Sequence, residues 1–405
     1  MKLLIIGSTW VEPRSTAAGS RMLQLLEAFD KAGWELTFAT AAKPSEHAFD
    51  LGALGIKLQA IQLNDDSFDV FVQDLQPDIV LFDRYITEEQ YGWRVYDRCP
   101  NAMRVLDTED LHCLRKARAT AVTQDRNCTT QDLFSDVAKR EIASIYRCDL
   151  TLMISEYEIE LLQHQFQVPL ALLHYVPFLV SSPASPLISF EDRAHFTSIG
   201  NFLHPPNWDA TLYLKKAIWP IIRKALPKAS VEIYGAYPSD KVFQLHNEAQ
   251  GFLIKGRAPD AHKVIQHAKV LLAPLRFGAG LKGKLIDAMQ CGTPSVTTSI
   301  GAEGMYDTTR WCGRVEDEPL AFAKAAIALY TSPQLWLEAQ RQGVEIVNTR
   351  FQKQRHAPAL IDKMLQIQAR LSAHRQANFT GQMLHFHQLR ASKYMSKWIA
   401  LKNKQ

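Results

Sequence analysis

Short apolar runs alternate with amphipathic helical patterns along almost the whole chain. In the first half, the clearest helical patterns span Ser15–Lys31 and Leu133–Tyr146. The apolar runs there predict strands at Lys2–Gly7, Trp34–Thr40, Ile56–Ile61, Asp78–Asp83, Met103–Asp107, Leu150–Ser155 and Ala171–Val176. Because these strands alternate with helices, the pattern predicts a parallel sheet with both faces covered.

The alternation restarts after a linker within Phe178–Glu191 that contains the Pro/Ser-rich run SSPASP. Strands are expected at His195–Gly200, Ser230–Gly235, Gly251–Gly256, Val270–Leu275 and Ser295–Thr298. Helices are expected at Asn207–Ala225, Ala261–His267, Lys282–Cys291, Pro319–Tyr330 and Pro333–Val347. The fold class is therefore α/β, with two doubly wound Rossmann-like domains at residues 1–182 and 190–350, followed by C-terminal helices and a tail at 351–405. A ligand is expected between the domains, beyond the carboxyl ends of the strands.

The composition narrows the class of protein. The chain has 405 residues, of which 47% are hydrophobic and 22% charged, and its net charge of +4 gives no reason to expect nucleic acid as a partner. The six cysteines show no zinc-site spacing, and free thiols indicate a reducing compartment. Met1–Gly7 is too short in its apolar part for a signal peptide, and no stretch is long enough to span a membrane. These features predict a cytoplasmic protein.

The most informative segment is Pro274–Met305, PLRFGAGLKGKLIDAMQCGTPSVTTSIGAEGM. It follows a strand and places Gly278, Gly280, Lys282 and Lys284 around the expected start of a helix. Cations are normally unfavourable at a helix N-terminus, whereas anions are favoured there. The glycines allow the backbone to approach a ligand closely. We therefore expect this loop to bind a phosphate or diphosphate.

The C-terminal tail has a different composition. Leu365–Gln405 contains no Asp or Glu but has seven Lys or Arg residues interleaved with large apolar side chains. Such a segment is most typical of a terminal helix packed on the protein body, or of a partly disordered tail, and less often of a basic amphipathic helix on an anionic membrane; nucleic acid is a minor alternative. Peripheral membrane contact at the inner face is thus one expectation for the tail.

Pro274–Met305 resembles the donor-binding core of glycosyltransferase family 4, also called group 1 glycosyltransferases, in a subgroup with a Gly/Lys-rich donor loop. Other segments are similar to that family in order and spacing: SIGNFLHPPNWDA at Ser198–Ala210, VEIYGAYP at Val231–Pro238, IKGRAPD at Ile254–Asp260, CDLTLMISEYEIELL at Cys148–Leu162 and STAAGSRM at Ser15–Met22. The resemblance covers most of residues 1–350.

The resemblance implies the GT-B fold, in which two Rossmann-like domains face one another across a cleft. It implies transfer of a sugar, usually from a nucleoside diphosphate sugar, to the hydroxyl of a glycan or lipid-linked acceptor in surface polysaccharide or glycoconjugate synthesis. No cofactor and no metal are expected, and the chain has no Asp-x-Asp motif. Lys, Arg and backbone amides must then meet the diphosphate charge.

The chain departs from the family at two positions of the donor motif. Many members have two glutamates separated by seven residues, and here Ala279 and Asp287 stand at those places. Ala279 cannot bind a sugar hydroxyl through its side chain. The Arg and Lys that usually follow the first strand of the second domain are also missing, since His204 and Asn207 lie in that turn.

Each candidate donor contact has a role and a structural alternative. We assign Lys282, Lys284 and Arg276 to the diphosphate, although Arg276 could instead pair with a structural carboxylate. Asp287 is expected to contact the ribose, and Glu303 either a sugar hydroxyl or its own turn. The remaining expected donor contacts are glycines, namely Gly278 and Gly280 in the donor loop, Gly235 after a second-domain strand and Gly19 in the first loop.

The catalytic candidates follow the strand Met103–Asp107. The family often has a histidine near the place of His112, and Asp107, Glu109 and Asp110 compete with it for an acid–base role. We select His112, Asp107 and Asp110.

One other polar pair and one single polar residue have structural explanations. Ser155 and Glu158 fit a helix capping box, and Asn207 fits a helix cap.

Two alternatives to a transferase remain open. One is a non-catalytic scaffold that binds nucleotide sugars, which the alanine at position 279 keeps open. The other is a different GT-B enzyme, such as a nucleotide-sugar epimerase.

Overall fold

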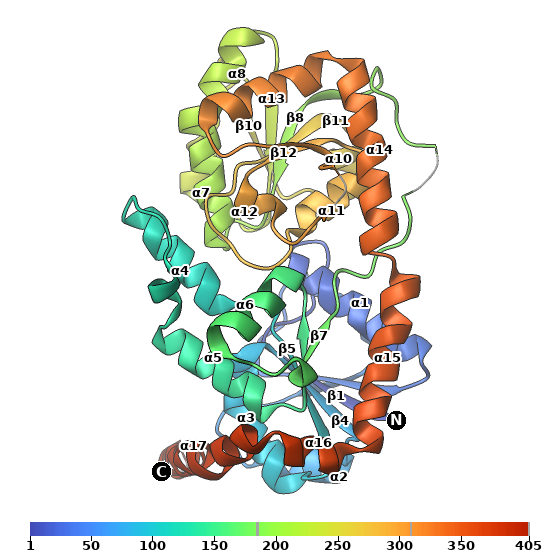
Figure 1. Cartoon of the computed structure of the whole chain (residues 1–405), viewed down its shortest axis with the longest axis vertical. Coiled ribbons are helices and arrows are strands. Elements are labelled where there is room, and N and C mark those ends of the chain that lie inside the picture. Colours follow the sequence, from blue (N-terminus) through green and yellow to red (C-terminus); the bar gives the residue numbers. More distant parts are fainter. Residues whose placement is uncertain (184–185, 308–309, 404–405) are drawn as a thin grey trace.

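The computed structural model describes residues 1–183, 186–307 and 310–403, which form two parallel sheets stacked along the long axis of the molecule (Figure 1). The first sheet has seven strands in the order β3-β2-β1-β4-β5-β6-β7. Their bounds are β1 Lys2–Gly7, β2 Glu35–Thr40, β3 Lys57–Ala60, β4 Ile79–Asp83, β5 Met103–Asp107, β6 Leu150–Met153 and β7 Leu173–Tyr175. All of these neighbours pair in parallel.

The second sheet has six parallel strands in the order β10-β9-β8-β11-β12-β13. Their bounds are β8 Ala194–Ile199, β9 Val231–Tyr234, β10 Phe252–Gly256, β11 Ala268–Ala273, β12 Ser295–Thr297 and β13 Gly313–Val315. In both sheets the strand order reverses beside the first strand of the domain, which is the doubly wound arrangement that the alternating pattern predicts. The expected α/β fold class is confirmed.

Helices cover both faces of each sheet. In the first domain they are α1 Ala17–Lys31, α2 Ser67–Leu75, α3 Arg84–Arg98, α4 His112–Thr123, α5 Asp136–Arg147 and α6 Glu156–Phe166. In the second they are α7 Pro205–Tyr213, α8 Trp219–Ala225, α9 Asp240–Phe243, α10 Ala261–His267, α11 Gly283–Gln290, α12 Ser299–Ala302, α13 Pro319–Thr331 and α14 Pro333–Arg350. Short 3₁₀ turns lie at Gly52–Leu54, Thr130–Leu133 and Leu170–Leu172.

The expected strands are confirmed with ends shifted by only a few residues, because continuous apolar runs mark strands that are buried on both faces. In β1, Leu4 and Ile6 join the hydrophobic core on one face, while Leu3 and Ile5 join the core on the other. The sequence missed β13 because three residues, one of them Gly313, are too few to show a period.

The predicted helix Asn207–Ala225 is present but is not regular. A π-helical turn at Leu214–Ile218 joins α7 to α8, just before Pro220. Proline has no N–H to donate and crowds the preceding turn, and a π turn accommodates that defect.

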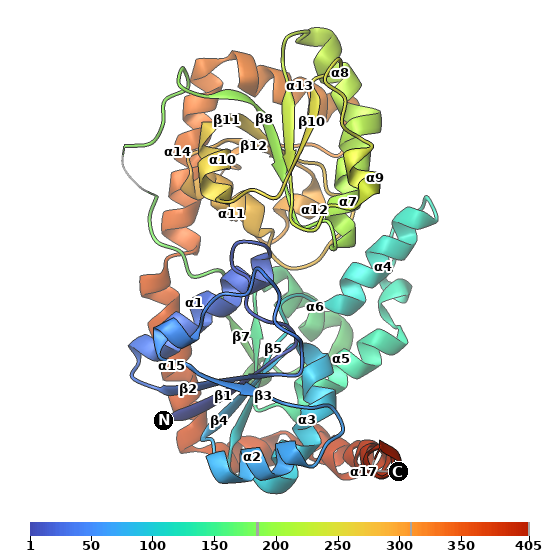
Figure 2. The same ribbon diagram turned by 180° about the vertical axis from the view of Figure 1, so that it is seen from behind.

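The end of the chain returns to the first domain. After α14, helix α15 (Lys353–Ala369) runs beside α1, and α16 (Leu371–Ala377) and α17 (Phe379–Asn403) cross the far end of that domain (Figure 2). Leu360, Met364 and Ile367 of α15 are buried in the same cluster as Met22 and Leu25 of α1. The last helices of the chain therefore complete the first domain. This is the packed terminal helix that the sequence offers as one expectation for the tail.

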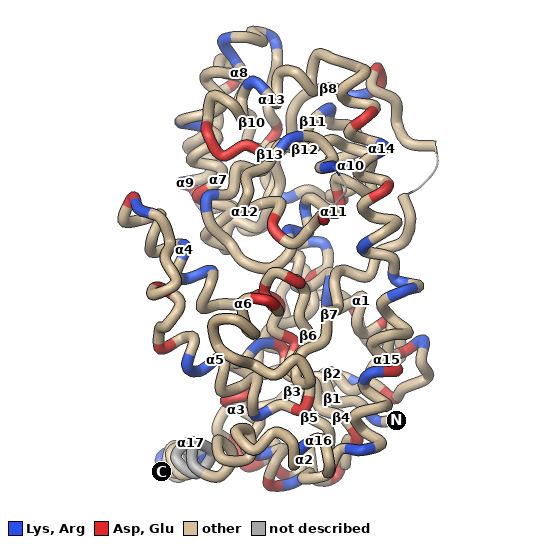
Figure 3. Tube along the Cα trace, in the orientation of Figure 1, with Lys and Arg blue, Asp and Glu red and all other residues tan. Residues whose placement is uncertain are grey.

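The carboxyl ends of the two sheets face one another. Loops after β1, β4 and β5 meet loops after β8, β9 and β11, and charged residues of both signs gather there around α6 and α11 (Figure 3). One cross-domain contact is the hydroxyl of Tyr237, which donates to Glu12 Oε2 at 2.9 Å. Another is Asn201 Nδ2, which donates to the carbonyl of Ser15 at 3.3 Å. The two domains thus touch across the cleft.

Candidate functional site

The N-termini of two helices meet at the centre of the cleft. Helix α1 begins at Ala17 in the first domain, and α11 begins at Gly283 in the second. A Cβ placed on Gly283 would lie 3.0 Å from Cβ of Ala17, so the two helix starts are in contact. Neither helix has an acidic residue in its first turn. The positive ends of two helix dipoles therefore converge here without a carboxylate of their own to offset them.

The loop between β11 and α11, which the sequence predicts to bind the donor and which is called the donor loop below, approaches the first domain through glycines. Gly278 and Gly280 have φ angles of 155° and 62°, which an ordinary side chain rarely adopts. A Cβ on Gly280 would lie 2.9 Å from Cβ of Asp110 and 3.2 Å from the carbonyl oxygen of Glu109. Any residue with a side chain would push the domains apart at this point.

Lys282 and Lys284 lie on either side of the first residue of α11. Lys282 is only 8% exposed, and its Nζ donates to the carbonyl of Gly280 at 2.5 Å. Lys284 Nζ donates to Oδ1 of Asn207 at 2.7 Å. Within the described residues neither ammonium forms an ion pair with a carboxylate. Burial lowers the pKa of both lysines to about 8. For Lys282, the charges of Glu303 and Glu158 raise the pKa but do not outweigh the effect of burial.

Asp107 lies at the end of β5 and is held by an arginine. Arg21 of α1 donates to Asp107 Oδ1 from Nη2 at 2.9 Å, and its Nη1 donates to the carbonyl of Val176. Both side chains are fully buried. Asp107 thus fixes α1 to the strand ends and has little access to the cleft.

Asp110 and His112 lie nearer the cleft and form a polar cluster with the second domain. His112 Nε2 is 3.5 Å from Asp110 Oδ1, and Arg115 Nε is 3.1 Å from Asp110 Oδ2. Burial would raise the pKa of Asp110, but Arg115 and His112 outweigh it and hold that pKa below its usual value. Burial lowers the pKa of His112 to about 4, so its imidazole is neutral at neutral pH. His204, at the start of α7, is close enough to Asp110 to feel its charge.

Two residues at neighbouring strand ends have left-handed backbone conformations. Arg84 follows β4 with φ 70°, and Glu109 follows β5 with φ 63°. Such angles are strained for residues other than glycine and tend to occur at functional sites. Oε1 of Glu109 is buried without a hydrogen-bond partner, and burial together with Asp107 raises the pKa of Glu109 well above its usual value. Glu109 is therefore a third polar group at this wall, beside the pair formed by Asp110 and His112.

A bidentate ion pair bridges the two domains. Arg118 of α4 donates to both carboxylate oxygens of Glu303, at 2.7 and 2.9 Å, and to the carbonyl of Gly278 at 3.0 Å. Glu303 therefore contacts the first domain in this conformation. The sequence did not single out Arg118, because its partner is 185 residues away and nothing local marks the pair.

Glu158 corrects an expectation. Ser155 makes no side-chain cap hydrogen bond, so the predicted capping box is not formed. Instead Glu158 Oε1 accepts from the backbone N–H of Gly280 at 2.8 Å and from that of Leu111 at 3.1 Å. Burial and the charge of Asp110 raise the pKa of Glu158 to about 8. Through these two hydrogen bonds, Glu158 holds the donor loop against the first domain.

Asn207 also differs from its expected role. It lies inside α7, whose N-cap is His204, so it does not cap the helix. Its side chain instead bridges the carbonyl of Asn201 and Nζ of Lys284. Asn207 therefore orients one of the two lysines of the donor loop.

Two of the expected donor contacts have protein partners. Arg276 pairs with Asp209, with Nε 2.9 Å from Oδ2, which is the structural pairing considered from the sequence. Asp287 Oδ1 is 3.3 Å from Nε2 of His262 on the neighbouring helix α10. Asp287 lies one turn into α11 and so stays beside the donor loop.

The two remaining glycines allow close packing. The backbone N–H of Gly19 donates to Thr16 Oγ1. A Cβ on Gly19 would lie 2.4 Å from the backbone of Glu12. A Cβ on Gly235 would lie 2.2 Å from the carbonyl oxygen of Gly200. Both contacts are within one domain.

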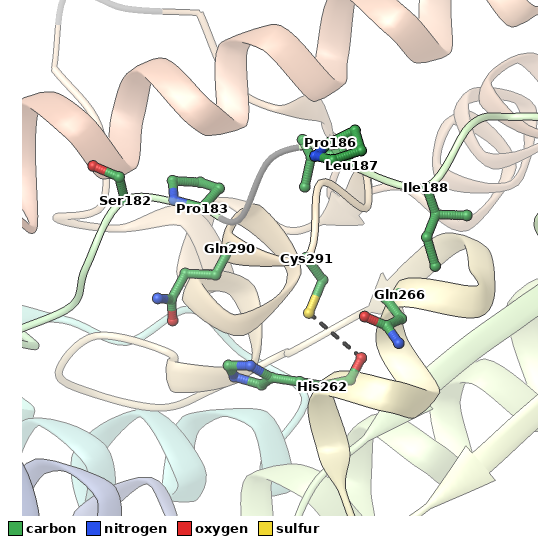
Figure 4. A pocket seen from close by; sticks show the side chains of 9 residues that line it. All are labelled: Ser182, Pro183, Pro186, Leu187, Ile188, His262, Gln266, Gln290 and Cys291. Atoms are coloured by element: carbon green, nitrogen blue, oxygen red, sulfur yellow. Dashed lines mark hydrogen bonds between the residues drawn. The ribbon is translucent and has the colours of Figure 1, made fainter.

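One cavity lies outside the cleft. It measures about 180 Å³ and is bounded by the linker on one side and by α10 and α11 on the other (Figure 4). Its lining residues are Ser182, Pro183, Pro186, Leu187, Ile188, His262, Gln266, Gln290 and Cys291. A cavity of about 10 Å³ lies beside Lys284 at the strand ends of the second domain.

The described ranges contain no cluster of His, Cys, Asp or Glu that could hold a metal ion. Within the same ranges no helix has both the length and the apolarity needed to cross a membrane. All six cysteines are free thiols.

Two facing doubly wound domains, with a cationic loop at the meeting point of the strand ends, define the GT-B class of proteins. Residues 193–357, which make up the second domain, match the family model described as "Glycosyl transferases group 1", so this part of the chain is similar to the group 1 glycosyltransferases. The expected resemblance is confirmed, while membership of a subgroup with a Gly/Lys-rich loop stays a prediction. No curated protein sequence matches the chain significantly.

Solved structures with this fold agree over nearly the whole chain. Sucrose-phosphate synthase from Thermosynechococcus elongatus has a TM-score of 0.66 at 15% identity, covering 91% of this chain and 99% of that one. HepE of Anabaena, solved with UDP and glucose, has a TM-score of 0.64 at 12% identity, covering 90% of this chain and all of that one. WaaG, a glycosyltransferase involved in lipopolysaccharide biosynthesis, has a TM-score of 0.61 at 12% identity, covering 89% of this chain and 98% of that one.

A longer protein also matches. S. aureus TarM, solved with UDP and other ligands, has a TM-score of 0.58 at 14% identity, and the matched part of this chain spans only 58% of its length. At these identities the similarity establishes the fold.

Proposed function

We propose that this chain transfers a sugar from a nucleoside diphosphate sugar to an acceptor hydroxyl. The observation that carries the proposal is the convergence of the α1 and α11 N-termini with buried Lys282 and half-buried Lys284, neither of which has a carboxylate partner among the described residues. Cations withdrawn from water cost folding free energy unless an anion offsets them. A diphosphate provides that offset and would receive backbone N–H groups from both helices.

The donor roles follow from position. Lys282, Lys284 and the amides at the start of α11 stabilise the negative charge that develops on the departing nucleoside diphosphate. Asp287, one turn further along, is placed to accept hydrogen bonds from the ribose hydroxyls. Arg276 would have to leave Asp209 to reach the diphosphate, so we give it a secondary role.

Donor binding requires the cleft to open. Because Ala17 and Gly283 are in contact, a diphosphate can enter only when the two helix starts separate. Opening breaks the ion pair between Arg118 and Glu303 and the hydrogen bond from Gly280 to Glu158. Once the donor is bound, Glu303 is free to contact its sugar.

The first domain supplies the acceptor side. In the transfer the bond from the sugar anomeric carbon to the diphosphate oxygen breaks, and a bond from that carbon to the acceptor oxygen forms. The acceptor hydroxyl loses its proton to the pair formed by His112 and Asp110, of which His112 is neutral and able to accept it. Asp107 acts indirectly by fixing the start of α1 through Arg21.

We assign the acceptor to a glycan or lipid-linked glycan of surface polysaccharide or glycoconjugate synthesis. WaaG, which has the same fold, is involved in lipopolysaccharide biosynthesis. We further propose hexosyl transfer without a metal ion, since lysines and helix N-termini supply the positive charge. Free thiols support a cytoplasmic location.

Thermal unfolding with a panel of nucleoside diphosphates and nucleotide sugars tests the donor site. A ligand at about 100 times its Kd adds about 2.7 kcal/mol to the free energy of unfolding of the parent. We expect one diphosphate to raise the melting temperature and the double variant Lys282→Ala/Lys284→Ala to lose that shift. A matched control, Lys241→Ala/Lys263→Ala, removes two exposed lysines of the same domain and should keep it. If no nucleotide raises the melting temperature of the parent protein, the donor site is not on this loop.

The alternatives make different predictions for the product. A scaffold would bind the nucleotide sugar and leave it intact, and an epimerase would convert the donor alone into a second nucleotide sugar. A transferase releases the nucleoside diphosphate and attaches the sugar to an acceptor.

A further inference from the structure

Helix α17 has two faces of different character. One face packs on the first domain, where His385 Nε2 lies 2.8 Å from the carbonyl oxygen of Arg147 and Ser396 Oγ accepts from Arg94. At its start, a Cβ on Gly381 would lie 2.1 Å from the carbonyl oxygen of Tyr146, so glycine allows the helix to sit directly on α5. The position of α17 on the body is therefore fixed by specific contacts.

The opposite face carries large apolar side chains into solvent. Seven of them are between 45% and 67% exposed, namely Phe379, Met383, Phe386, Tyr394, Met395, Trp398 and Leu401. At 100° per residue they fall within one half of the helix circumference, away from the buried His385 and Ser396. Soluble monomers rarely expose a contiguous apolar surface of this size without a partner.

The charges that α17 itself contributes to this face, among the residues that the structure describes, are positive. Lys397 lies within the apolar face, and Lys402 lies at its border with Nζ 4.3 Å from the ring centroid of Trp398. Lys393, on the other border, pairs with Asp97 of α3, which neutralises that carboxylate. No Asp or Glu occurs anywhere in Leu365–Gln405. The charge of this surface complements an anionic partner.

The composition favours a lipid surface over a second protein. Protein interfaces are depleted in lysine, whereas helices that lie in a membrane interface combine aromatic and aliphatic side chains on one face with lysines at its borders. Tyr394 and Trp398 are of the type that settles at the level of lipid headgroups. A second copy of this chain would also bring lysines against lysines.

The place of α17 in the molecule allows such contact. It lies at the end of the first domain farthest from the second domain (Figures 1 and 2). A membrane against this end would leave the cleft accessible and the second domain free to move away from the first.

We propose that the outward face of α17 binds the surface of an anionic membrane, with the helix lying in the plane of the interface. The apolar side chains insert between the headgroups, and Lys397 and Lys402 contact the lipid phosphates. This proposal does not depend on the transferase reaction, because it concerns another surface and is tested without any nucleotide sugar.

The test is co-sedimentation of the full chain with vesicles of phosphatidylcholine alone or of phosphatidylcholine mixed with phosphatidylglycerol. We expect binding to the mixed vesicles and much weaker binding to the neutral ones. Lys397→Gln/Lys402→Gln should weaken binding by about fivefold for each lysine removed. Trp398→Ser/Leu401→Ser should weaken it by about tenfold or more. The control Leu203→Ser/Leu335→Ser removes exposed leucines from the second domain and should bind like the parent.

Circular dichroism and gel filtration decide between the remaining outcomes. Variants that keep the parent melting curve but lose vesicle binding support the proposal. Absence of binding to mixed vesicles would overturn it, and so would parent-like binding by both α17 variants. A dimer that dissociates in the Trp398→Ser/Leu401→Ser variant would show that a second copy covers this face, which also overturns it.

Discussion

At the scale of single residues, the site depends on cations placed where the fold does not favour them. The ammonium groups of Lys282 and Lys284 have no carboxylate partner in the described residues, and their pKa values fall to about 8. A lysine has a pKa of about 10.4 in the unfolded chain. Between these values the unfolded state binds more protons, so the free energy of unfolding rises as the pH increases from about 8 to about 10.4.

A bound diphosphate should reverse this shift. An anion beside the lysines favours their charged forms, so their pKa values rise and the complex takes up protons at a pH of about 8.5. Calorimetric titration in two buffers with different ionisation enthalpies measures the uptake as a difference in apparent binding enthalpy. We expect net uptake in the parent. It should be reduced in Lys284→Met if that variant still binds. Equal enthalpies in both buffers would mean that the lysines are not at the ligand.

The sequence predicted these lysines because the signal is local. Glycines, lysines and a helix start within one short run conflict with the usual preference at a helix N-terminus, and such conflicts mark functional sites. Arg118 and Glu158 carry no such mark, since their partners are distant in the sequence and are brought near only by the contact between domains. For the same reason the S-x-x-E pattern predicts a capping box, whereas the Glu158 carboxylate in fact accepts a hydrogen bond from Gly280 of the other domain.

At the scale of elements, the ion pair between α4 and the turn after α12 holds the closed form. Arg118→Met keeps the length of the side chain but removes both hydrogen bonds to Glu303 and the one to Gly278. We expect the variant to populate an open cleft, with a larger radius of gyration by small-angle X-ray scattering in the absence of ligand. Its affinity for the diphosphate should rise, because less of the binding free energy is spent on opening.

Arg126→Met serves as the matched control. Arg126 lies just beyond the same helix and pairs with Asp132 within the first domain, so its loss does not touch the interface. The control should keep the radius of gyration of the parent. An unchanged radius in Arg118→Met would show that this pair does not hold the cleft closed.

Element positions were largely predictable because both sheets are parallel and buried. Each strand reads as a continuous apolar run, and each helix as a longer periodic one. The irregular features escaped prediction, namely the short β13 and the π turn at Leu214–Ile218. They depend on partners or defects that a hydrophobic pattern does not encode.

At the scale of the whole molecule, the return of the chain to the first domain determines what the tail can do. Arg375 of α16 donates to both carboxylate oxygens of Asp149 and to the carbonyls of Pro100 and Ala102. These contacts fix α16, and α17 follows immediately. The sequence indicated a packed helix and a membrane-binding helix as separate alternatives. In the structure one face of α17 is packed while the other remains exposed.

Release of nucleoside diphosphate from nucleotide sugars, with and without a pool of glycan acceptors, tests the central claim most directly. We predict release from one class of donor, stimulated by acceptor. In Lys282→Met/Lys284→Met the rate should fall by about 100-fold or more, as expected when groups that stabilise developing charge are removed, whereas Lys241→Met/Lys263→Met should behave like the parent. Binding of a nucleotide sugar without release under any condition would contradict the transferase account and favour a scaffold, and a rate unchanged in the first variant would move the donor site away from α11.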